Sequence, residues 1–518
     1  MAKRIYLFSL LALLVSLFLL TTSWVTANED GTAAPNYILM IGDDMAIETL
    51  SCYKIGEDPA VTPNLDQLCE NGLRFDNFWS QPVCSPTRAT LLTGQYGFAN
   101  GVGTPSGDVS GVDWDFPEDP TANDNAMGGM SGMGALSGMG AMGGMTGMAG
   151  MAGMAGMAGN IVERETENQQ GGIRTPFPAD AVTFLHALKN SSEHDYQTAA
   201  VGKWHLASDS NGGLDHPQRV GFDHYAGSIR GGGLREYDSW SKVTNGGDPV
   251  GNTTYATTDK VDDAIDWLDS VEDNKPWFLW LAFNAPHSPY HIPPAELLNS
   301  DAKDLADDAS NKDMFKAMIE AMDTEIGRLL ASLDEKTRAN TYLIFMGDNG
   351  SPSTLTSAPF IQRRAKGSVY QGGVNVPLIV AGPGIEKGQT TQSLANTVDI
   401  FATVLDISDI PLEDAKPKDK PFHSVSLKPI LHDDANTQVR DFAYADAFGP
   451  SLGGGRDSRT IRNEEYKLIE HRLLDREEFY RLSSDPYEKI NLLNRRMTPA
   501  AQQNYDELKA LMLELTGE

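Results

Sequence analysis

The chain has 518 residues, with 71 acidic and 41 basic side chains that give a formal net charge of −30 at pH 7. This length is enough for a large α/β domain and a smaller second domain, with a core that needs no disulfide bonds for stability. The acidic balance argues against a basic nucleic-acid-binding face, so we expect no nucleic-acid partner.

The first 27 residues are typical of a secretory signal peptide. Lys3 and Arg4 precede an apolar run at 5–20, and Val25-Thr26-Ala27 provides a small-residue cleavage site. The run is short for a membrane span, and no Cys follows it directly to suggest a lipid anchor. We therefore expect an exported protein, periplasmic or secreted, without stable membrane insertion. An uncleaved N-terminal anchor is the alternative.

Short apolar runs that end in Gly or polar residues alternate with helical patterns along the chain. The expected strands are 37–41, 198–201, 277–283, 341–346 and 376–380, and the expected helices begin at 62 or span 182–189, 260–271 and 313–334. Such runs are typical of buried parallel strands. The alternation predicts an α/β fold with a large, mainly parallel mixed sheet flanked by helices. Ligands of such sheets collect at the carboxyl ends of the strands.

Residues 127–160 interrupt this alternation. Met recurs there mostly every third residue among Gly and Ala, without any charged side chain. We interpret this stretch as a disordered or loosely ordered part of an insertion at about 101–175 in a domain that spans 36–435. Binding of Cu(I) by the thioethers and a polyproline-like packing of Gly-rich strands are the alternatives.

The pattern changes again from about residue 440. Short strands are expected at 466–469 and 478–482, a turn at Ser484-Asp485-Pro486, and a closing amphipathic helix at 500–515. This arrangement predicts a small α+β subdomain over 440–518.

Residues 82–94, PVCSPTRATLLTG, are the segment most informative about function. Cys84 is followed at fixed spacing by Pro86 and Arg88 and then by a helix-forming run. One sulfur is thereby placed at a strand-to-helix turn, where the helix N-terminus and the guanidinium both favour anions. A buried core cysteine at a turn is the alternative.

Two expected strands each end in a pair of oxygen-bearing side chains. Asp43 and Asp44 follow the strand at 37–41, and Asp348 and Asn349 follow the strand at 341–346. Four such donors that converge suit a hard cation, Ca²⁺ or Mg²⁺. Use of these residues in helix caps or Asx turns is the alternative.

Cations and imidazoles are found near the other strands. Lys203 and His205 follow the strand at 198–201, His287 follows the strand at 277–283, and Lys366 precedes the last expected strand. Two lysines and two histidines beside a nucleophile suit anion binding and proton transfer.

Over about residues 36–490 these motifs resemble the formylglycine-dependent, arylsulfatase-like sulfatases of the alkaline phosphatase superfamily, whose Cys-x-Pro-x-Arg signature is matched at 84–88. The resemblance implies that a maturation enzyme oxidises Cys84 to formylglycine. It implies one Ca²⁺, with Mg²⁺ less favoured, held by Asp43, Asp44, Asp348, Asn349 and residue 84. Arg88 would steady the hydrated aldehyde, and Lys203, His287 and Lys366 would bind the sulfate oxygens. His205 would help to expel sulfate.

The implied reaction is hydrolysis of a sulfate ester, either a sulfated carbohydrate or an aryl sulfate. Phosphoester or phosphonate ester hydrolysis on the same scaffold and a non-catalytic exported binding protein are the alternatives. The chain departs from the family pattern at Asp195, where Gly is usual, and at Gln371, where Glu is common. Pocket residues could include Tyr290, His291, Arg363, Arg364, Asp215 and His216, or these could be ordinary loop residues. Arg363 and Arg364 hint at an anionic leaving group.

The other two cysteines, Cys52 and Cys69, could form a disulfide if Cys84 is converted. Two buried free thiols are equally compatible with the sequence.

Overall fold

The computed structural model describes residues 33–106, 176–191, 194–230, 234–273, 275–299, 301–306, 308–449 and 457–518. The expected signal peptide at 1–27 and the Met-rich stretch at 127–160 lie outside the described residues. Among the helices within these ranges, none has both the length and the apolar character that a membrane span needs.

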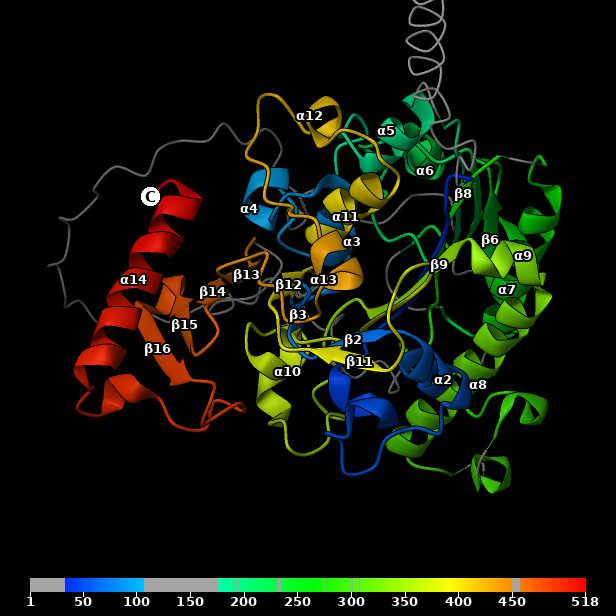
Figure 1. Ribbon diagram of the computed structural model, residues 1–518. Helices are drawn as coiled ribbons and strands as arrows, with labels where there is room; N and C mark the ends of the chain where they lie inside the picture. The colour runs from blue at the N-terminus through cyan, green and yellow to red at the C-terminus, as the bar shows by residue number, and fades with distance from the viewer. Residues whose placement is uncertain are drawn as a thin grey trace, which may run out of the picture.

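A ten-stranded mixed sheet lies at the centre of the larger body (Figure 1), in the order β11-β2-β10-β9-β1-β8-β4-β5-β6-β7. The strands are β1 Asn36–Gly42, β2 Leu73–Phe75, β4 Gln197–Gly202, β5 His224–Gly227, β6 Trp240–Thr244, β7 Val250–Asn252, β8 Trp277–Ala282, β9 Thr341–Gly347, β10 Leu378–Ala381 and β11 Gln389–Thr391. The central strands β9, β1, β8, β4 and β5 pair in parallel, whereas β10, β6 and β7 pair antiparallel. Four parallel strands therefore bring their carboxyl ends to one edge at the site described below.

Strand β1 shows why the central strands are unbroken apolar runs in the sequence. Tyr37, Leu39 and Ile41 pack into the core on one face of the sheet, and Ile38 and Met40 pack into the core on the other. The first face is covered by α3 Cys84–Thr93, α5 Phe184–Asn190, α11 Asp399–Ile407 and α13 Lys428–His432. The second face is covered by α2 Pro63–Asn71, α7 Ala256–Ser270 and α8 Asn311–Ser332. Burial on both faces removes the polar alternation of a half-exposed strand.

A second, antiparallel sheet forms a smaller body at the C-terminal end (Figure 1). Its strands are β13 Ala443–Ala447, β14 Ser458–Arg462, β15 Tyr466–His471 and β16 Arg476–Arg481, and α14 Pro499–Thr516 packs on it through Leu508 and Met512. The predicted fold class is thereby confirmed. The domain limits at 435 and 440 and the extent of the insertion stay predictions.

The structure differs from the sequence prediction mainly at the margins of the large sheet. The strand expected at 376–380 is β10, Leu378–Ala381, and it runs antiparallel to β9. The sequence analysis missed the short strands β2, β5, β6, β7 and β11, which have three to five residues each. Strands of this length at the margins carry too few residues for a clear periodicity.

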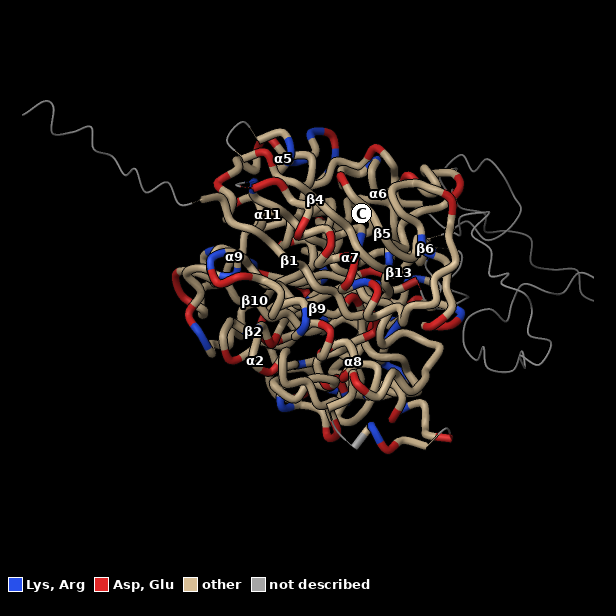
Figure 2. Tube along the Cα trace, turned by 90° about the vertical axis from the view of Figure 1, so that its right-hand side faces the viewer, with Lys and Arg blue, Asp and Glu red and all other residues tan. Residues whose placement is uncertain are grey.

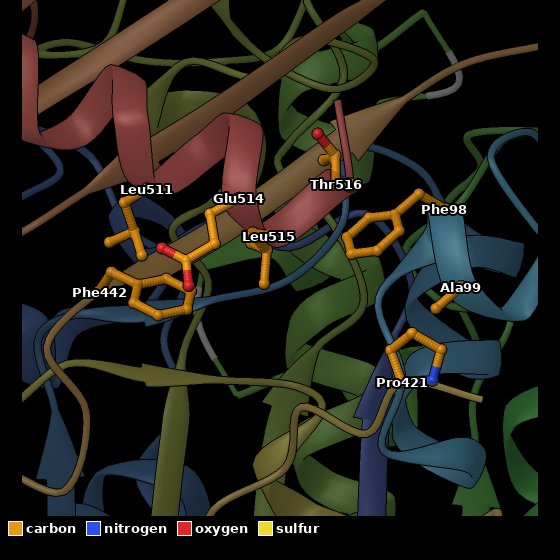
Figure 3. Close-up of a pocket in the computed structure, with 9 residues that line it drawn as sticks. Phe98, Ala99, Pro421, Phe442, Leu511, Glu514, Leu515 and Thr516 are labelled. Atoms are coloured by element: carbon orange, nitrogen blue, oxygen red, sulfur yellow. The ribbon is translucent and has the colours of Figure 1, made fainter. Parts of the chain in front are cut away.

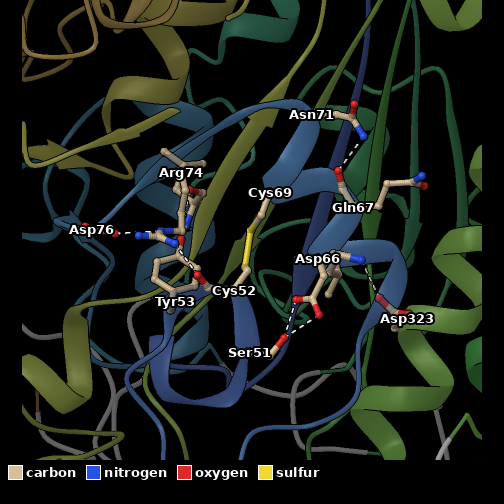
Figure 4. The surroundings of a disulfide bond; sticks show 12 residues. Ser51, Cys52, Tyr53, Asp66, Gln67, Cys69, Asn71, Arg74, Asp76 and Asp323 are labelled. Carbon is tan, nitrogen blue, oxygen red and sulfur yellow. Dashed lines mark hydrogen bonds and ion pairs between the residues drawn. A yellow bond between two sulfur atoms is a disulfide. The ribbon is translucent and has the colours of Figure 1, made fainter. Parts of the chain in front are cut away.

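A disulfide joins Cys52 to Cys69 of α2 (Figure 4). Next to it, the Arg74 guanidinium lies over the Tyr53 ring, 5.0 Å from the ring centroid. Of the two alternatives that the sequence left open, the structure contains the disulfide. Cys84 is therefore the free cysteine of this three-cysteine chain.

The excess of acidic residues is visible along two long helices of the larger body. In Figure 2, acidic segments lie along α7 and α8 with basic segments among them. This mixed pattern is typical of solvated helix faces.

Candidate active site

The polar residues that follow four strands meet at one edge of the large sheet. The backbone continues the strand pairing beyond the strand ends: Asp348 N–H donates to the Gly42 carbonyl at 3.0 Å, and Lys203 N–H donates to the Ala282 carbonyl at 2.8 Å. At the end of β9, a Cβ on Gly347 would lie 2.1 Å from the Met45 carbonyl oxygen. Only glycine permits this close approach.

Three carboxylates and one sulfur form a compact buried cluster. Ligand atoms of Asp43, Asp44, Cys84 and Asp348 all lie within 4.8 Å of one another. Asn349 donates through Nδ2 to Asp44 Oδ1 at 2.8 Å, while its buried Oδ1 has no hydrogen-bond partner among the described residues. Asp44 has a left-handed backbone with φ of 73°, a strained conformation that is common at functional sites. An oxygen-rich donor set with an unsatisfied acceptor fits a hard cation such as Ca²⁺.

Cys84 is the first residue of α3 and is buried. Its Sγ lies 3.5 Å from Asp43 Oδ1 and 3.9 Å from Lys203 Nζ. Burial raises the pKa of the thiol, and Asp348 raises it further. Because the thiolate is the nucleophilic form of cysteine, the unmodified side chain is poorly suited to direct attack.

Two fully buried cations lie behind this cluster. Arg88 donates to Asp348 Oδ2 at 2.9 Å and to the Lys203 carbonyl at 2.7 Å. Lys203 forms an ion pair with Asp43 Oδ2. Burial alone would lower the pKa of each cation, but Asp348 raises that of Arg88 and Asp43 raises that of Lys203. Both side chains therefore keep their charge inside the protein.

A lysine and a histidine lie on the more open side. Lys366 Nζ is 2.5 Å from Asp44 Oδ1, and His287 Nε2 is 3.9 Å from Asp44 Oδ2. Both side chains are 17% exposed. Burial would raise the pKa of Asp44, but Lys366 and His287 bring it down to about 2. Burial and Lys366 lower the pKa of His287 to about 3, so this imidazole is neutral.

His205 completes the set. It has a left-handed backbone with φ of 59°, and its carbonyl accepts the Ser85 hydroxyl at 2.7 Å. Burial, Lys203 and Arg88 hold the pKa of His205 well below its usual value. Its Nδ1 has no hydrogen-bond partner in the part of the chain that the structure describes. The structure thus places all the residues predicted for catalysis and for the metal in one cluster.

The possible pocket residues from the sequence analysis fall into two groups, of which the first is engaged in structural contacts. His216 lies between Trp204 Nε1 and the Phe177 carbonyl, 3.0 Å from each, and is fully buried in the core. Arg364 is held by the Glu488 carbonyl and so turns away from the cluster. His291 packs against the Tyr237 and Tyr255 rings. These three residues have structural contacts.

The other candidates have fewer contacts. Burial raises the pKa of Tyr290, and the nearby Asp44 carboxylate raises it too. Arg363 and Asp215 are exposed.

The sequence analysis missed Tyr237. Its hydroxyl donates to the carbonyls of Asn284 and His287, 2.7 Å from each, and thereby fixes the loop that carries His287. No motif surrounds Tyr237, and it lies 50 residues from His287 in sequence. No signal in the sequence could have identified this contact.

A hollow of about 610 Å³ lies elsewhere, between α4 Gly97–Asn100 and α14 (Figure 3). Phe98 and Pro421 line one side and Leu511 and Leu515 line the other. None of its lining residues belongs to the catalytic cluster.

Comparison with known proteins gives two family matches. A family model described as Sulfatase matches residues 35–124 and 161–410. A second, described as N-sulphoglucosamine sulphohydrolase, C-terminal, matches residues 364–516. The first match covers more than half of the chain and includes every residue of the cluster.

Curated relatives are similar over most of this chain. Human N-acetylgalactosamine-6-sulfatase is 26% identical over 77% of this chain and 66% of its own length. The N-acetylglucosamine-6-O-sulfatase of Bacteroides thetaiotaomicron is 24% identical over 91% of this chain and 85% of its own length. The chain spans 60 to 66% of the length of some curated relatives, the human enzyme among them.

Solved structures share the fold. One, determined in complex with its substrate D-glucosamine-2-N,6-O-disulfate, superposes with a TM-score of 0.65 at 21% identity, over 93% of this chain and 98% of the other. At this identity the likeness concerns the fold.

Proposed function

This chain belongs to the sulfatase family, and on that premise we propose that it is a sulfuric ester hydrolase that acts on a sulfated carbohydrate. The observation that carries the proposal is the position of Cys84 inside a buried carboxylate cluster that the partly exposed Lys366 ammonium contacts. Two relatives named as 6-sulfatases of N-acetylhexosamines and a structural neighbour solved with a sulfated glucosamine support a saccharide substrate.

We infer that Cys84 is converted to formylglycine by a maturation enzyme. The hydrated aldehyde would supply one hydroxyl for attack on sulfur and a second hydroxyl whose deprotonation releases sulfate. The raised pKa of the thiol favours this chemistry over attack by the cysteine itself.

The donor set fits one Ca²⁺, held by Asp43, Asp44, Asp348 and Asn349 with residue 84. Such an ion would neutralise charge on the sulfuryl oxygens. The protein holds three carboxylates close together. Arg88 and Lys203 make this possible, because they neutralise two of these carboxylates by forming ion pairs with them.

The remaining residues bind the sulfate group and move protons. Lys366 and His287, on the more open side, are positioned to hold the sulfate oxygens. His287 Nδ1 lies 2.9 Å from the Ser288 carbonyl, which can only accept, so this nitrogen carries the proton. Nε2 is then unprotonated, so His287 donates to the sulfate group or to the leaving oxygen only after Nε2 has taken up a proton from solvent. His205, which is neutral, would accept the proton whose loss expels sulfate.

We also propose that the mature protein is exported, that residues 36–435 form its catalytic domain, and that residues 440–518 form a second subdomain. The signal-like pattern at 1–27 supports export. N-terminal sequencing of the purified protein tests cleavage after Ala27.

The decisive test combines mass spectrometry with a sulfate-release assay on protein from a maturation-competent host. We expect formylglycine at residue 84 and release of sulfate from N-acetylglucosamine 6-sulfate or N-acetylgalactosamine 6-sulfate. A matched pair of aryl sulfate and aryl phosphate separates sulfatase from phosphatase activity. Cys84→Ala should abolish turnover and leave the melting temperature unchanged. An unmodified Cys84, or full activity of Cys84→Ala, contradicts the assignment.

A further inference from the structure

The segment that carries Lys366 contacts the chain on two sides of the active site. This segment, residues 362–374, includes η7 Gln362–Arg364 and α10 Gln371–Val374. Lys366 N–H donates to the Ser351 carbonyl at 3.0 Å, and Gly367 N–H donates to the Pro82 carbonyl at 2.8 Å. A shift of the segment would therefore move the Lys366 ammonium relative to both the carboxylates and residue 84.

One residue of the C-terminal body, Glu488, holds this segment on both sides of Lys366. Its Oε2 accepts the Gln371 N–H, the first amide of α10, at 2.8 Å. Its backbone carbonyl accepts a hydrogen bond from the Arg364 guanidinium. Glu488 is 1% exposed and has a left-handed backbone with φ of 57°. A charged residue with strained backbone in a buried position needs strong compensating contacts.

The compensating charge comes from Lys467 of β15. Its Nζ lies 2.7 Å from Glu488 Oε1, and both side chains are at most 2% exposed. The same ammonium lies 4.6 Å from the centroid of the Trp79 ring. Trp79 ends β3, Phe78–Trp79, five residues before Cys84. The buried pair thus lies between the Lys366 segment and the chain that leads into the nucleophile turn.

Arg364 strengthens the first anchor. Its guanidinium stacks over the Tyr370 ring at 4.4 Å and donates to the Tyr480 hydroxyl at 3.2 Å. Tyr370 in turn donates to Glu478 of β16, at 2.8 Å from Oε2. Both anchors of the segment therefore end on the C-terminal sheet.

We propose that Glu488 is a positioning residue, which sets the Lys366 ammonium in the active site by fixing Arg364 before it and Gln371 after it. The proposal rests on the proposed function, because it assigns Lys366 a contact with the substrate sulfate. Glu488 itself touches neither substrate nor the reacting atoms. The C-terminal body then contributes to the active site through Glu488, by its carboxylate and by its backbone carbonyl.

A double-mutant cycle tests whether Glu488 acts through Lys366. We expect Glu488→Ala to lower kcat/KM at least about tenfold, because small misplacements of a catalytic group are costly. In a Lys366→Ala background, the same change should lower it less than about twofold, because coupled residues are not additive. Glu488→Gln keeps an acceptor for the Gln371 amide and should recover part of the activity. Equal losses in the two backgrounds overturn the proposal.

Glu477→Ala is the matched control. Glu477 belongs to β16, the strand that carries Glu478 and Tyr480, but binds Lys509, at 2.9 Å, and Tyr505 on α14. We expect it to keep wild-type kcat/KM. A loss as large as that of Glu488→Ala would mean that any damage to the C-terminal body has the same effect.

Hydrogen exchange provides a readout that does not need activity. The Gln371 amide and its neighbours at 362–374 should exchange faster in Glu488→Ala than in wild type, and Glu477→Ala should leave them unchanged. Should Glu488→Ala not fold, Glu488→Gln should show the same change to a smaller degree. Unchanged exchange in the folded variants overturns the proposal. If wild type released no sulfate, the proposed function would fail, and the exchange data would still decide the positioning role.

Discussion

Two walls of the active site contain basic side chains in different surroundings. The inner wall, Arg88 and Lys203, is fully buried, and each cation is paired with a carboxylate. The outer wall, Lys366 and His287, is 17% exposed and faces Asp44. Because the inner cations are buried and paired, they allow the carboxylates to be buried together. The outer groups are partly exposed and remain available to an incoming anion.

The pKa values of the carboxylates also depend on the wall that each carboxylate faces. Burial and Asp43 raise the pKa of Asp348 to about 6, even though Arg88 pairs with it. The pKa of Asp44, in contrast, is held at about 2 by the outer wall against the effect of burial. Carboxylates at equal depth therefore differ according to the wall that each one faces.

The largest effect is expected from the inner wall. Arg88→Ala leaves the Asp348 carboxylate buried without its partner, and such a loss costs about 3–5 kcal/mol of unfolding free energy. Activity should fall by a factor of about 10³ as well, because the carboxylates lose their arrangement. Denaturant unfolding and kcat/KM measure the two losses. Arg88→Lys cannot make both hydrogen bonds and should recover little. If Arg88→Ala unfolded at the same denaturant concentration as wild type, the inner wall would have no larger role in stability than the outer wall.

The outer wall should show a kinetic effect without a comparable loss of stability. Lys366→Ala is expected to lower kcat/KM by about 10²–10³, the usual effect of losing one preorganised donor. Its melting temperature should stay close to wild type, because the side chain is partly exposed. Lys316→Ala is the control, since it removes a similarly exposed lysine that pairs with Asp58 on the surface. Destabilisation equal to that of Arg88→Ala would contradict the comparison.

Removal of calcium should destabilise the folded protein, because the carboxylates between the two walls then repel one another without the ion. An ion present at about 100 times its dissociation constant adds about 2.7 kcal/mol of stability. We expect chelation to lower the unfolding midpoint of wild type and of Lys366→Ala alike. Asp348→Asn, which takes one donor charge from the cluster, should respond much less. Calorimetry with added Ca²⁺ or chelator measures the difference, and an equal response of wild type and Asp348→Asn would argue against the metal site.

The sequence predicts the carboxylates of the cluster well because they follow long buried strands. Asp43 and Asp348 interrupt apolar runs whose parallel pairing brings their ends together, so position along the strand indicates position in space. Glu488 and Tyr237 could not be found in this way. Each contacts the site from 50 to 117 residues away in sequence, from segments without a motif or a strand end. Contacts of that kind depend on tertiary packing between distant segments, which local patterns do not encode.

The same limit applies to two of the possible pocket residues. Arg364 precedes Lys366 and His216 follows Asp215, and nearness in sequence suggested a shared pocket. Arg364 instead reaches Glu488, and His216 packs behind Trp204. Direction of a side chain on a short turn is decided by its tertiary partners.

The smallest expected effect concerns His216, which supports the inner wall from behind through Trp204. Burial lowers the pKa of His216 to about 4, whereas an unfolded histidine titrates near about 6.5. Between these values the unfolded state binds more protons, so this contribution to stability is complete above pH 6.5 and is lost as the pH falls toward 4. From pH 6.5 to 5 the loss amounts to about 1.6 kcal/mol. His216→Asn should flatten the pH dependence of unfolding in this range by that amount. An unaltered slope in His216→Asn would show that this imidazole is not kept neutral by the fold, and that the inner wall relies on its ion pairs alone.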